Sequence, residues 1–352
     1  MRIFFILIPL LFIGFLPNAK ETEEPTNEKN GRLIILPLPF YASTTGFGLT
    51  LKLLHTNIGK SVFIDLTSFA STSNMQAVFL TIGQKIFLSK FFWNITTGGN
   101  NFHIKFYGIG NNVKLDEEVD FKSQAYFISP KYGYYLHRLL KIYLSYSHSR
   151  NDLKDYNDPN NFHLDLWEKL KHKSITQNLI GGGFELGTKD DTIRPQKQFT
   201  LKYNYQIATP SVFKNTYAYR GSLIEVTLAV PLVKDYLSHA SSLKYESISA
   251  SAPFIKYPKI IVRGIDKQRH RNIKSFALMN EERYYISDNW LLVPFWDIGK
   301  VASSNEDSLY DLHYGYGVGF RYIIKDTLVV RFDLGFSKNG ESSVVFNYGH
   351  SF

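Results

Sequence analysis

The chain has no cysteine among its 352 residues. A disulfide framework is therefore excluded as a source of stability. Because no cysteine follows the apolar N-terminal segment, that segment is also not the signal of a lipid-anchored protein. The fold must be held by packing, hydrogen bonds and ion pairs alone.

Long apolar runs are scarce too. The one run, residues 3–16, has about 14 residues, whereas a helix that spans a bilayer needs about 20. It follows Met1-Arg2 and ends before the small residue Ala19, as in a secretory signal peptide; an uncleaved anchor is the alternative. We expect a cleaved signal peptide at 1–19 and a short disordered lead-in at 20–32. With no later membrane helix expected, the exported protein is periplasmic, secreted or a membrane barrel.

Motifs that carry catalysis are missing. The sequence contains no Gly-x-Ser-x-Gly elbow, no zinc-spaced histidines and no Gly-rich phosphate loop. His148 with Ser149 and His239 with Ser241 fall on strand-like segments, but a lipase within a barrel also needs a placed polar partner. We interpret these histidines as ordinary lumen or interface residues, and expect no enzyme, no cofactor and no metal.

The charge is moderate, and the net value of +9 says little about partners. The most basic stretch is KIIVRGIDKQRHRNIK, residues 259–274. It lacks a recognisable nucleic-acid-binding fold and belongs to an exported chain, so no nucleic acid is expected. Its central cations are Lys267, Arg269, His270 and Arg271. We favour the interpretation that they are solvated; binding to lipopolysaccharide phosphates is the alternative.

Alternation of apolar and polar residues is what the sequence has in abundance. One face is aromatic and aliphatic over about ten residues, the length with which a tilted strand crosses hydrocarbon. The opposite face mixes glycine with Arg and Asp, which suits a wet lumen better than a dry core. The 23 Tyr and 28 Phe residues agree, because aromatic side chains gather at both membrane interfaces. The pattern is clearest in residues 62–67, 78–88, 199–207, 314–322, 328–337 and 343–352.

Turn-like breaks divide the chain into about 16 segments, and an even number is expected of a closed antiparallel barrel. The sequence therefore predicts an all-β fold, a transmembrane antiparallel β-barrel over residues 33–352. The longest polar inserts should be its extracellular loops, by the short-turn, long-loop rule of such barrels. They are residues 108–120, 151–173 and 251–272, with a shorter one at 302–311.

Several motifs in a fixed order carry a family resemblance. VRGI (262–265) is followed by NEERYYI (280–286) and FWDIGKV (295–301). This order resembles the barrel domain of the BamA/TamA-like outer-membrane family, also called the bacterial surface antigen family. Weaker echoes are LPLPFYASTTGFGLT (36–50), FYGIGNN (106–112) and DDTIRP (190–195).

The sequence departs from the family pattern in three ways. Ile265 replaces the usual aromatic residue after Arg-Gly, and Glu282 stands where an aromatic is common, so either Glu281 or Glu282 could face inward. The family's periplasmic POTRA domains need about 75 residues each, and only about a dozen separate Ala19 from the barrel. The resemblance therefore implies a member that lacks POTRA domains.

The resemblance also implies a latch inside the barrel. Strand parity places Glu281 and Arg283 on one face of their strand and Phe295, Asp297 and Gly299 on one face of the next. An ionised Asp297 on the lipid side would cost several kcal/mol, about 2–4 for a charge at mid-depth. The long loop then folds into the lumen and brings Arg263 against the two carboxylates, with Gly264 allowing a sharp turn.

The last strand ends on an aromatic stripe. Phe346, Tyr348 and Phe352 share one face. A terminal Phe on such a strand looks like the C-terminal signal that the outer-membrane barrel-insertion machinery reads. The resemblance and this signal imply a location in the bacterial outer membrane.

Three functions are open at this stage. The leading one is to assist insertion or translocation of proteins or lipids at the outer membrane. Its partners would be membrane lipids and lipopolysaccharide, the insertion machinery during biogenesis, client outer-membrane proteins or a periplasmic partner. The alternatives are a passive pore or structural surface barrel, and an outer-membrane lipid hydrolase. A fold does not by itself choose among them.

Overall fold

A computed structural model describes residues 32–352 with gaps at 43–45, 59–60, 88–89, 115, 159, 161, 169–173, 189–196, 210–214, 304–310, 325–327 and 351. The expected signal peptide, almost all of the lead-in, the Asp-rich stretch 190–195 and most of the insert 302–311 lie outside the described residues. None of the helices that it describes has the length and the apolar run needed to cross a membrane.

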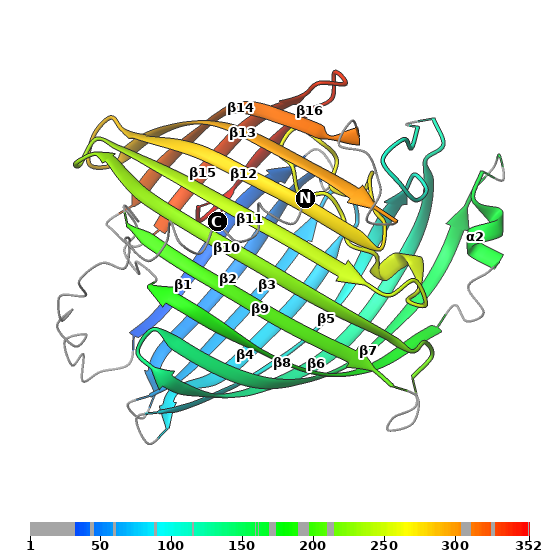
Figure 1. Ribbon diagram of the computed structural model, residues 1–352, viewed down its shortest axis with the longest axis horizontal. Coiled ribbons are helices and arrows are strands. Elements are labelled where there is room, and N and C mark those ends of the chain that lie inside the picture. The colour runs from blue at the N-terminus through cyan, green and yellow to red at the C-terminus, as the bar shows by residue number, and fades with distance from the viewer. Residues whose placement is uncertain are drawn as a thin grey trace, which may run out of the picture.

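The described residues form a closed antiparallel barrel in which each strand pairs with its neighbours in sequence, and β1 pairs with β16 (Figure 1). This confirms the predicted all-β barrel and its strand number. A short helix, α2 (Leu164–Glu168), and a 3-10 turn, η2 (Phe254–Lys256), lie in the connections. The strands are β1 (Arg32–Ala42), β2 (Gly46–Ile58), β3 (Val62–Ser71), β4 (Gln76–Phe87), β5 (Phe91–Phe106), β6 (Val119–His137), β7 (Leu140–Asn157), β8 (Ser174–Thr188), β9 (Gln198–Ala208), β10 (Tyr219–Val233), β11 (Leu237–Ile248), β12 (Lys274–Tyr285), β13 (Trp290–Ala302), β14 (His313–Ile324), β15 (Leu328–Ser337) and β16 (Ser342–Tyr348).

The two ends of the barrel differ in their connections. Because the strands are antiparallel, every second connection lies at the same end. One end carries the long connections, among them 107–118, 158–173 and 249–273, and we call it the loop end. The other, the turn end, carries short ones such as 138–139 and 234–236.

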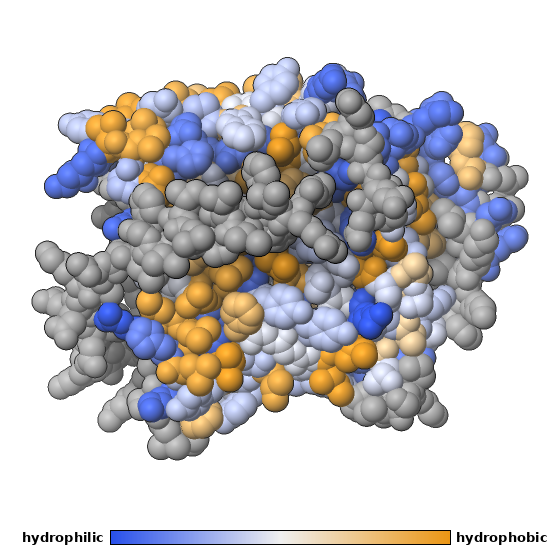
Figure 2. All heavy atoms as spheres, in the orientation of Figure 1, coloured by the Kyte–Doolittle hydropathy of each residue, from blue (hydrophilic) through white to orange (hydrophobic). Residues whose placement is uncertain are grey.

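The wall has an apolar outer face and a polar inner face, as the alternation predicts. Trp296, Tyr316 and Phe320 are 50%, 55% and 43% exposed, whereas the alternate residues Asp297 and Arg321 are almost fully buried. Apolar side chains gather in patches over the barrel wall in Figure 2. Alternate residues of a barrel strand point to opposite faces, so the buried charges lie inside.

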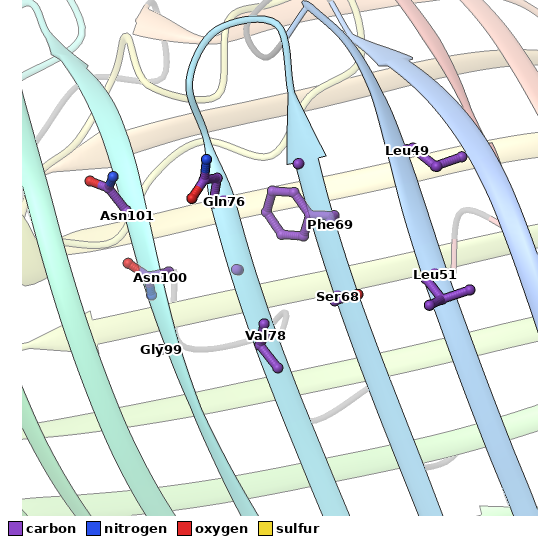
Figure 3. A pocket seen from close by; sticks show the side chains of 11 residues that line it. Leu49, Leu51, Ser68, Phe69, Gln76, Val78, Gly99, Asn100 and Asn101 are labelled. Carbon is purple, nitrogen blue, oxygen red and sulfur yellow. The ribbon is translucent and has the colours of Figure 1, made fainter.

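A shallow hollow lies on the wall between β2 and β5 (Figure 3). Leu49, Leu51 and Val78 stand around the small residues Ser68 and Gly99, which leave the space open. None of the residues that line the hollow is charged. It is a gap in apolar packing with no group that could do chemistry.

Two strand ends differ from the prediction. β7 continues to Asn157 although the sequence indicates a loop from Asn151, because its polar end pairs with β6: Ser123 donates to Asn151 (2.9 Å) and Lys154 to Gln124 (2.8 Å). β16 ends at Tyr348 and does not continue to Phe352. There Gly349 adopts a left-handed φ of 80° and its N–H donates to Val329, which ends the ladder.

Candidate functional site

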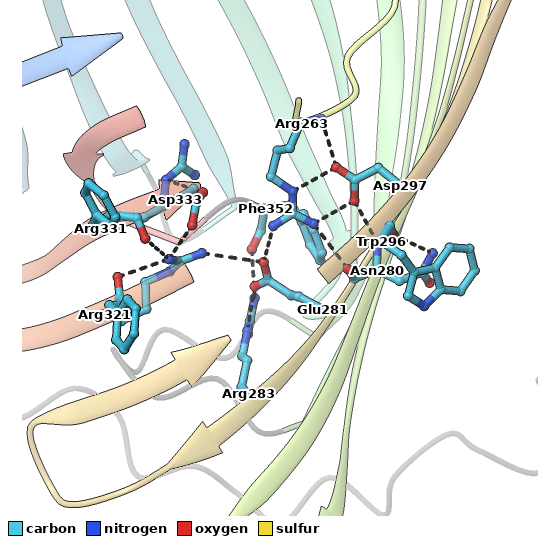
Figure 4. A network of polar contacts seen from close by, with 12 residues as sticks. Arg263, Asn280, Glu281, Arg283, Trp296, Asp297, Arg321, Arg331, Asp333 and Phe352 are labelled. Atoms are coloured by element: carbon cyan, nitrogen blue, oxygen red, sulfur yellow. Dashed lines mark hydrogen bonds and ion pairs between the residues drawn. The ribbon is translucent and has the colours of Figure 1, made fainter. Parts of the chain in front are cut away.

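Arg263, in the long connection between β11 and β12, binds two carboxylates of the wall (Figure 4). Its Nε and Nη2 donate to the two oxygens of Asp297 at 2.8 and 2.7 Å, and its Nη1 donates to Glu281 at 2.9 Å. Its backbone N–H also donates to Asp297, at 3.0 Å. Only a planar guanidinium can make this set of contacts, which a lysine ammonium could not replace.

The two carboxylates come from the inner faces of neighbouring strands. Glu281 on β12 and Asp297 on β13 are 1% exposed, whereas the side chain of Trp296 points away from the network in Figure 4. The choice between the two adjacent glutamates is therefore settled: Glu281 faces inward, and Glu282 lies on the outer face. The sequence could not decide this, because one residue of register reverses both.

Small residues let the tip of the connection approach the wall. Gly264 has a φ of 94°, and a Cβ there would meet the backbone of Phe336. A Cβ on Gly299 would lie 2.8 Å from Val262, and one on Gly315 would overlap the carbonyl of Arg263. Phe295 provides the floor, with the Arg263 guanidinium 3.8 Å from its ring centre.

The network extends further than the sequence motifs indicated. Arg283, which the strand parity places on the same face as Glu281, donates to it (2.8 Å). Beyond the predicted residues, Arg321 on β14 lies 3.8 Å from the same carboxylate. Arg321 also donates to Asp333 on β15 at 2.6 Å, and Asp333 lies 3.3 Å from Arg331. The only sequence signal for Arg321, Arg331 and Asp333 was an Arg or Asp on the polar side of an alternating strand.

The same connection is attached to the last strands of the barrel. The N–H of Gly264 donates to Ser343 of β16 at 2.9 Å, and Arg269 forms an ion pair with Glu341 just before β16. The N–H of Asp266 also points to Glu341, at 3.4 Å. One loop thus joins β12 and β13 to β16.

The sequence favoured solvation for the central cations of this loop, but not all of them are solvated. Lys267 is exposed, but Arg269, His270 and Arg271 are 8%, 1% and 1% exposed. The Arg271 guanidinium lies 5.0 Å from the ring centre of Phe106, and its main chain pairs with Gly110. Solvation was the wrong prediction for Arg269, His270 and Arg271, because the sequence of a loop does not show which other segments of the chain cover its side chains.

The Gly-Ile-Gly-Asn motif of residues 108–111 supplies part of that cover. The Gly110 N–H donates to the Arg271 carbonyl at 2.9 Å. The Asn111 side chain exchanges two hydrogen bonds with the backbone of Val301 at the end of β13, at 2.6 and 3.0 Å. The motif therefore ties the loop to the same strand that carries Asp297.

The expected C-terminal signal divides into separate positions. Phe346 pairs with the outward-facing Phe332 and lies on the outer face. The side chain of Tyr348 is outside the described residues. Phe352 does not continue the outer stripe: Arg283 donates to its main-chain oxygen at 3.4 Å and lies 5.8 Å from its ring centre. The bend at Gly349 accounts for this difference.

The chemistry of the network is that of a structural clamp. Its groups are arginines and carboxylates that satisfy one another, and among the described residues no cluster of three potential metal ligands occurs. Buried charges are costly unless paired, so removal of one member leaves the others uncompensated. The network fixes where the loop sits.

Reversal of the charge at Asp297 should therefore destabilise the barrel. In Asp297→Arg two guanidiniums face each other beside Phe295, and we expect a loss of about 3–5 kcal/mol in the free energy of unfolding. The double variant Asp297→Arg/Arg263→Asp should recover part of the lost free energy of unfolding. The measurement is the urea midpoint of the heat-modifiable folded band on gels.

The matched control is Asp65→Arg. Asp65 pairs with Lys52 inside the barrel at 2.9 Å, but both side chains are about a quarter exposed, and such pairs contribute about 0–1 kcal/mol. An Asp297→Arg protein as stable as wild type would contradict the clamp.

A methyl group at Gly315 should displace the loop tip. We expect Gly315→Ala to expose the wall beneath Gly264, because the new Cβ occupies the place of the Arg263 carbonyl. Since the chain lacks cysteine, a single Ser343→Cys reports this exposure through its rate of maleimide labelling. Gly221→Ala, where the nearest atom is 3.4 Å away, should leave that rate unchanged. Equal rates in the two alanine variants would argue against the tight approach.

Acid should weaken the packing of this loop. Burial, with help from His313 and Arg269, lowers the pKa of His270 to about 3, compared with about 6.5 in an unfolded chain. The unfolded state therefore binds a proton at His270 that the folded state does not bind. The free energy of unfolding falls as pH falls from about 6.5 towards 3. His270→Phe should reduce this acid dependence in urea titrations at several pH values. An identical pH dependence of stability in wild type and His270→Phe would refute this role of His270.

Comparison with known proteins shows the type of barrel. No family model matches the sequence, and no curated protein matches it either. Among solved structures, BamA from Haemophilus ducreyi lacking POTRA domains 1–3 is similar, with a TM-score of 0.67 at 11% identity over 91% of this chain and 70% of that one. CdiB from Escherichia coli is similar too, with a TM-score of 0.62 at 12% identity over 93% of this chain and 68% of that one. For CdiB from Acinetobacter baumannii the TM-score is 0.57 at 10% identity, over 90% of this chain and 59% of that one. At these identities the likeness shows the fold, and the chain has the barrel fold of BamA and CdiB.

Proposed function

We propose that the protein is a barrel of the bacterial outer membrane that assists proteins or lipids to insert into or cross that membrane, through the seam between β1 and β16. One observation carries the proposal. Among the described residues, β1 and β16 are joined through two residue pairs, Tyr41–Phe346 and Ala42–Val345, whereas β1 and β2 pair over eleven positions, from Arg32–Thr56 to Ala42–Gly46. A wall this weakly closed at one place can open there.

Two prolines support the weak seam. Pro37 and Pro39 lie in β1 with one residue between them, so the two missing N–H groups fall on the same side of the strand. The β1–β2 ladder is continuous through both positions, and proline is tolerated in a sheet where no ladder partner needs its N–H. The missing donors therefore belong on the seam side, where β16 could not complete its pairing.

The arginine clamp supports the seam from inside. The loop that Arg263 fixes to β12 and β13 also holds β16 through Ser343 and Glu341. It spans the wall on one side of the seam and keeps β16 in position while the pairs to β1 separate. An opening confined to the seam is then possible without loss of the rest of the barrel.

The partners of this function are proposals too. An opened seam would expose backbone N–H and C=O groups of its two edge strands, and an incoming strand of a client outer-membrane protein could pair with such an edge. Lipids would meet the same opening from the membrane. Lipopolysaccharide finds less support in the loop cations than the sequence suggested, since Lys267 is exposed whereas Arg269 and Arg271 are buried. Export through a cleaved signal peptide, insertion by the barrel machinery and a periplasmic partner complete the proposal.

Locking the seam should abolish the activity. In the double variant Tyr41→Cys/Phe346→Cys the two thiols replace directly paired residues, whose Cα spacing in an antiparallel ladder, about 4.5–5.5 Å, suits a disulfide. We expect the oxidised protein to lose its ability to speed the insertion of an unfolded outer-membrane protein into liposomes. Reductant should restore it.

Tyr41→Cys/Phe47→Cys is the matched control, because it links the same residue to its partner on β2. It should keep its activity in both redox states. If the locked seam assists insertion as well as the open one, the seam is not the route. A steady conductance in planar bilayers that is the same with and without the Tyr41→Cys/Phe346→Cys disulfide, together with no assisted insertion, would indicate a passive pore instead.

A further inference from the structure

Four polar side chains form a cluster on the outer face of the wall, where apolar side chains prevail. His239 and Ser241 lie on β11 and pair directly with Glu282 and Asn280 of β12. Because Glu281 faces inward, its neighbours Glu282 and Asn280 face outward, and so do their partners. A carboxylate and an imidazole on this face are costly in a membrane, and such residues mark functional sites.

The cluster has the hydrogen-bond order of a catalytic triad. Nδ1 of His239 lies 2.6 Å from Oε1 of Glu282, and Nε2 of the same ring lies 2.7 Å from Oγ of Ser241. The imidazole thus stands between a carboxylate and a hydroxyl, one on each ring nitrogen. This is the arrangement in which a histidine activates a serine nucleophile while an acid orients the ring.

The second His–Ser pair of the sequence does not share this arrangement. His148 and Ser149 are adjacent on β7 and therefore point to opposite faces. Nδ1 of His148 lies 2.8 Å from Asn178 instead. Spacing by two along a strand, as in His239 and Ser241, puts both groups on one face, and the neighbouring strand supplies the acid.

The surroundings of the cluster are apolar and aromatic. On β10, Val230 and Leu228 pair with His239 and Ser241, and on β13 Trp296 pairs with Asn280. Near the turn end, three outward aromatic residues stand 69%, 43% and 50% exposed: Tyr236, Tyr284 and Trp290. Aromatic side chains of this kind mark the membrane–water interface.

The depth of the cluster fits an ester group. His239 is the third residue of β11, and a strand advances about 3.4 Å per residue. The cluster therefore lies only a few residues along the strand from the aromatic girdle. In a bilayer this is the boundary where acyl chains meet the polar headgroups. The acyl ester carbonyls of a glycerophospholipid lie at that boundary, beside apolar side chains that suit its chains.

We propose that Ser241, His239 and Glu282 form a catalytic triad that hydrolyses acyl esters of glycerophospholipids from within the membrane. Oγ of Ser241 attacks the ester carbonyl carbon while Nε2 of His239 takes the hydroxyl proton, and Glu282 holds the Nδ1–H of the resulting imidazolium. The carbon–oxygen bond to glycerol then breaks, and His239 returns the proton to the leaving oxygen. A lysophospholipid leaves, and the acyl group stays on Ser241.

Water completes the reaction. His239 takes a proton from a water molecule whose oxygen attacks the acyl carbon, and the bond to Ser241 breaks as the proton returns to Oγ. The sum is one ester and one water consumed, one fatty acid and one lysophospholipid formed. No oxidant, metal or further reactant is needed.

Asn280 can stabilise the negative oxygen that forms on the way. The Ser241 hydroxyl donates to its Oδ1 at 2.7 Å. A half-turn of the amide presents its NH2 group at the same position, which leaves the serine proton to His239 and supplies a donor to the oxyanion. Because the main chain of Asn280 also accepts from Arg263 at 3.2 Å, the clamp inside the barrel holds this residue in place.

The experiment measures fatty acid release by purified protein in vesicles of phosphatidylethanolamine and phosphatidylglycerol. Wild type should release fatty acid and lysophospholipid in equal amounts. Ser241→Ala and His239→Asn should lower the rate about 1000-fold, and Glu282→Gln should lower it less. A fluorophosphonate probe, which reacts with activated serines, should label wild type at Ser241 and fail to label His239→Asn.

Two controls match these variants. Ser242→Ala changes the next residue, which faces inward and is 2% exposed, and His148→Asn changes another outward histidine; both should keep the rate. Fatty acid release by Ser241→Ala equal to that of wild type, or no probe reaction at Ser241, would overturn the triad. Probe labelling with cleavage of soluble short-chain esters only would overturn the phospholipid assignment.

The triad and the seam are separable. The inference rests on the proposed membrane location but not on the insertion activity, because β11 and β12 lie away from β1 and β16 in the strand order. The oxidised Tyr41→Cys/Phe346→Cys protein should therefore hydrolyse phospholipid at the wild-type rate. Loss of hydrolysis on locking the seam would contradict an independent site.

Discussion

The pairing of Arg263 with Asp297 and Glu281 is the interaction on which the rest of the structure depends. Three buried charges inside a barrel are stable only together, since each alone would face a large desolvation cost. Their pairing fixes the connection between β11 and β12, and that connection reaches β16 through Ser343. Among the described residues, the two-pair junction of β1 and β16 therefore includes a strand that this loop contacts.

β12 works on both of its faces. Inward, Glu281 and Arg283 belong to the clamp; outward, Asn280 and Glu282 complete the cluster with His239 and Ser241. Because Glu282 and Asn280 pair directly with His239 and Ser241 of β11, order imposed on β12 from inside also positions the side chains outside. The loop clamp and the proposed hydrolytic site thus share one element, although they serve separate functions.

The sequence predicted much of this because a barrel strand repeats every two residues. Alternation identified the wall, and the family motifs identified Arg263, Asp297 and the adjacent pair Glu281 and Glu282. Arg321 and Asp333 were missed since an isolated Arg or Asp on an alternating strand has no motif around it. The burial of Arg269 and Arg271 was missed because a loop sequence does not show which segments fold over it, and the end of β16 was misplaced because Gly349 turns out of the ladder.

By itself the sequence determined the all-β barrel, its number of strands and which residues can share a face, because these follow from local periodicity and from turn residues. Only the tertiary structure decided which faces meet. It chose Glu281 over Glu282 for the interior, left two pairs at the seam among the residues that the structure describes, and set Glu282 beside His239 across a loop of more than twenty residues. Such contacts depend on the register between strands, and register is a property of the closed sheet that no single strand contains.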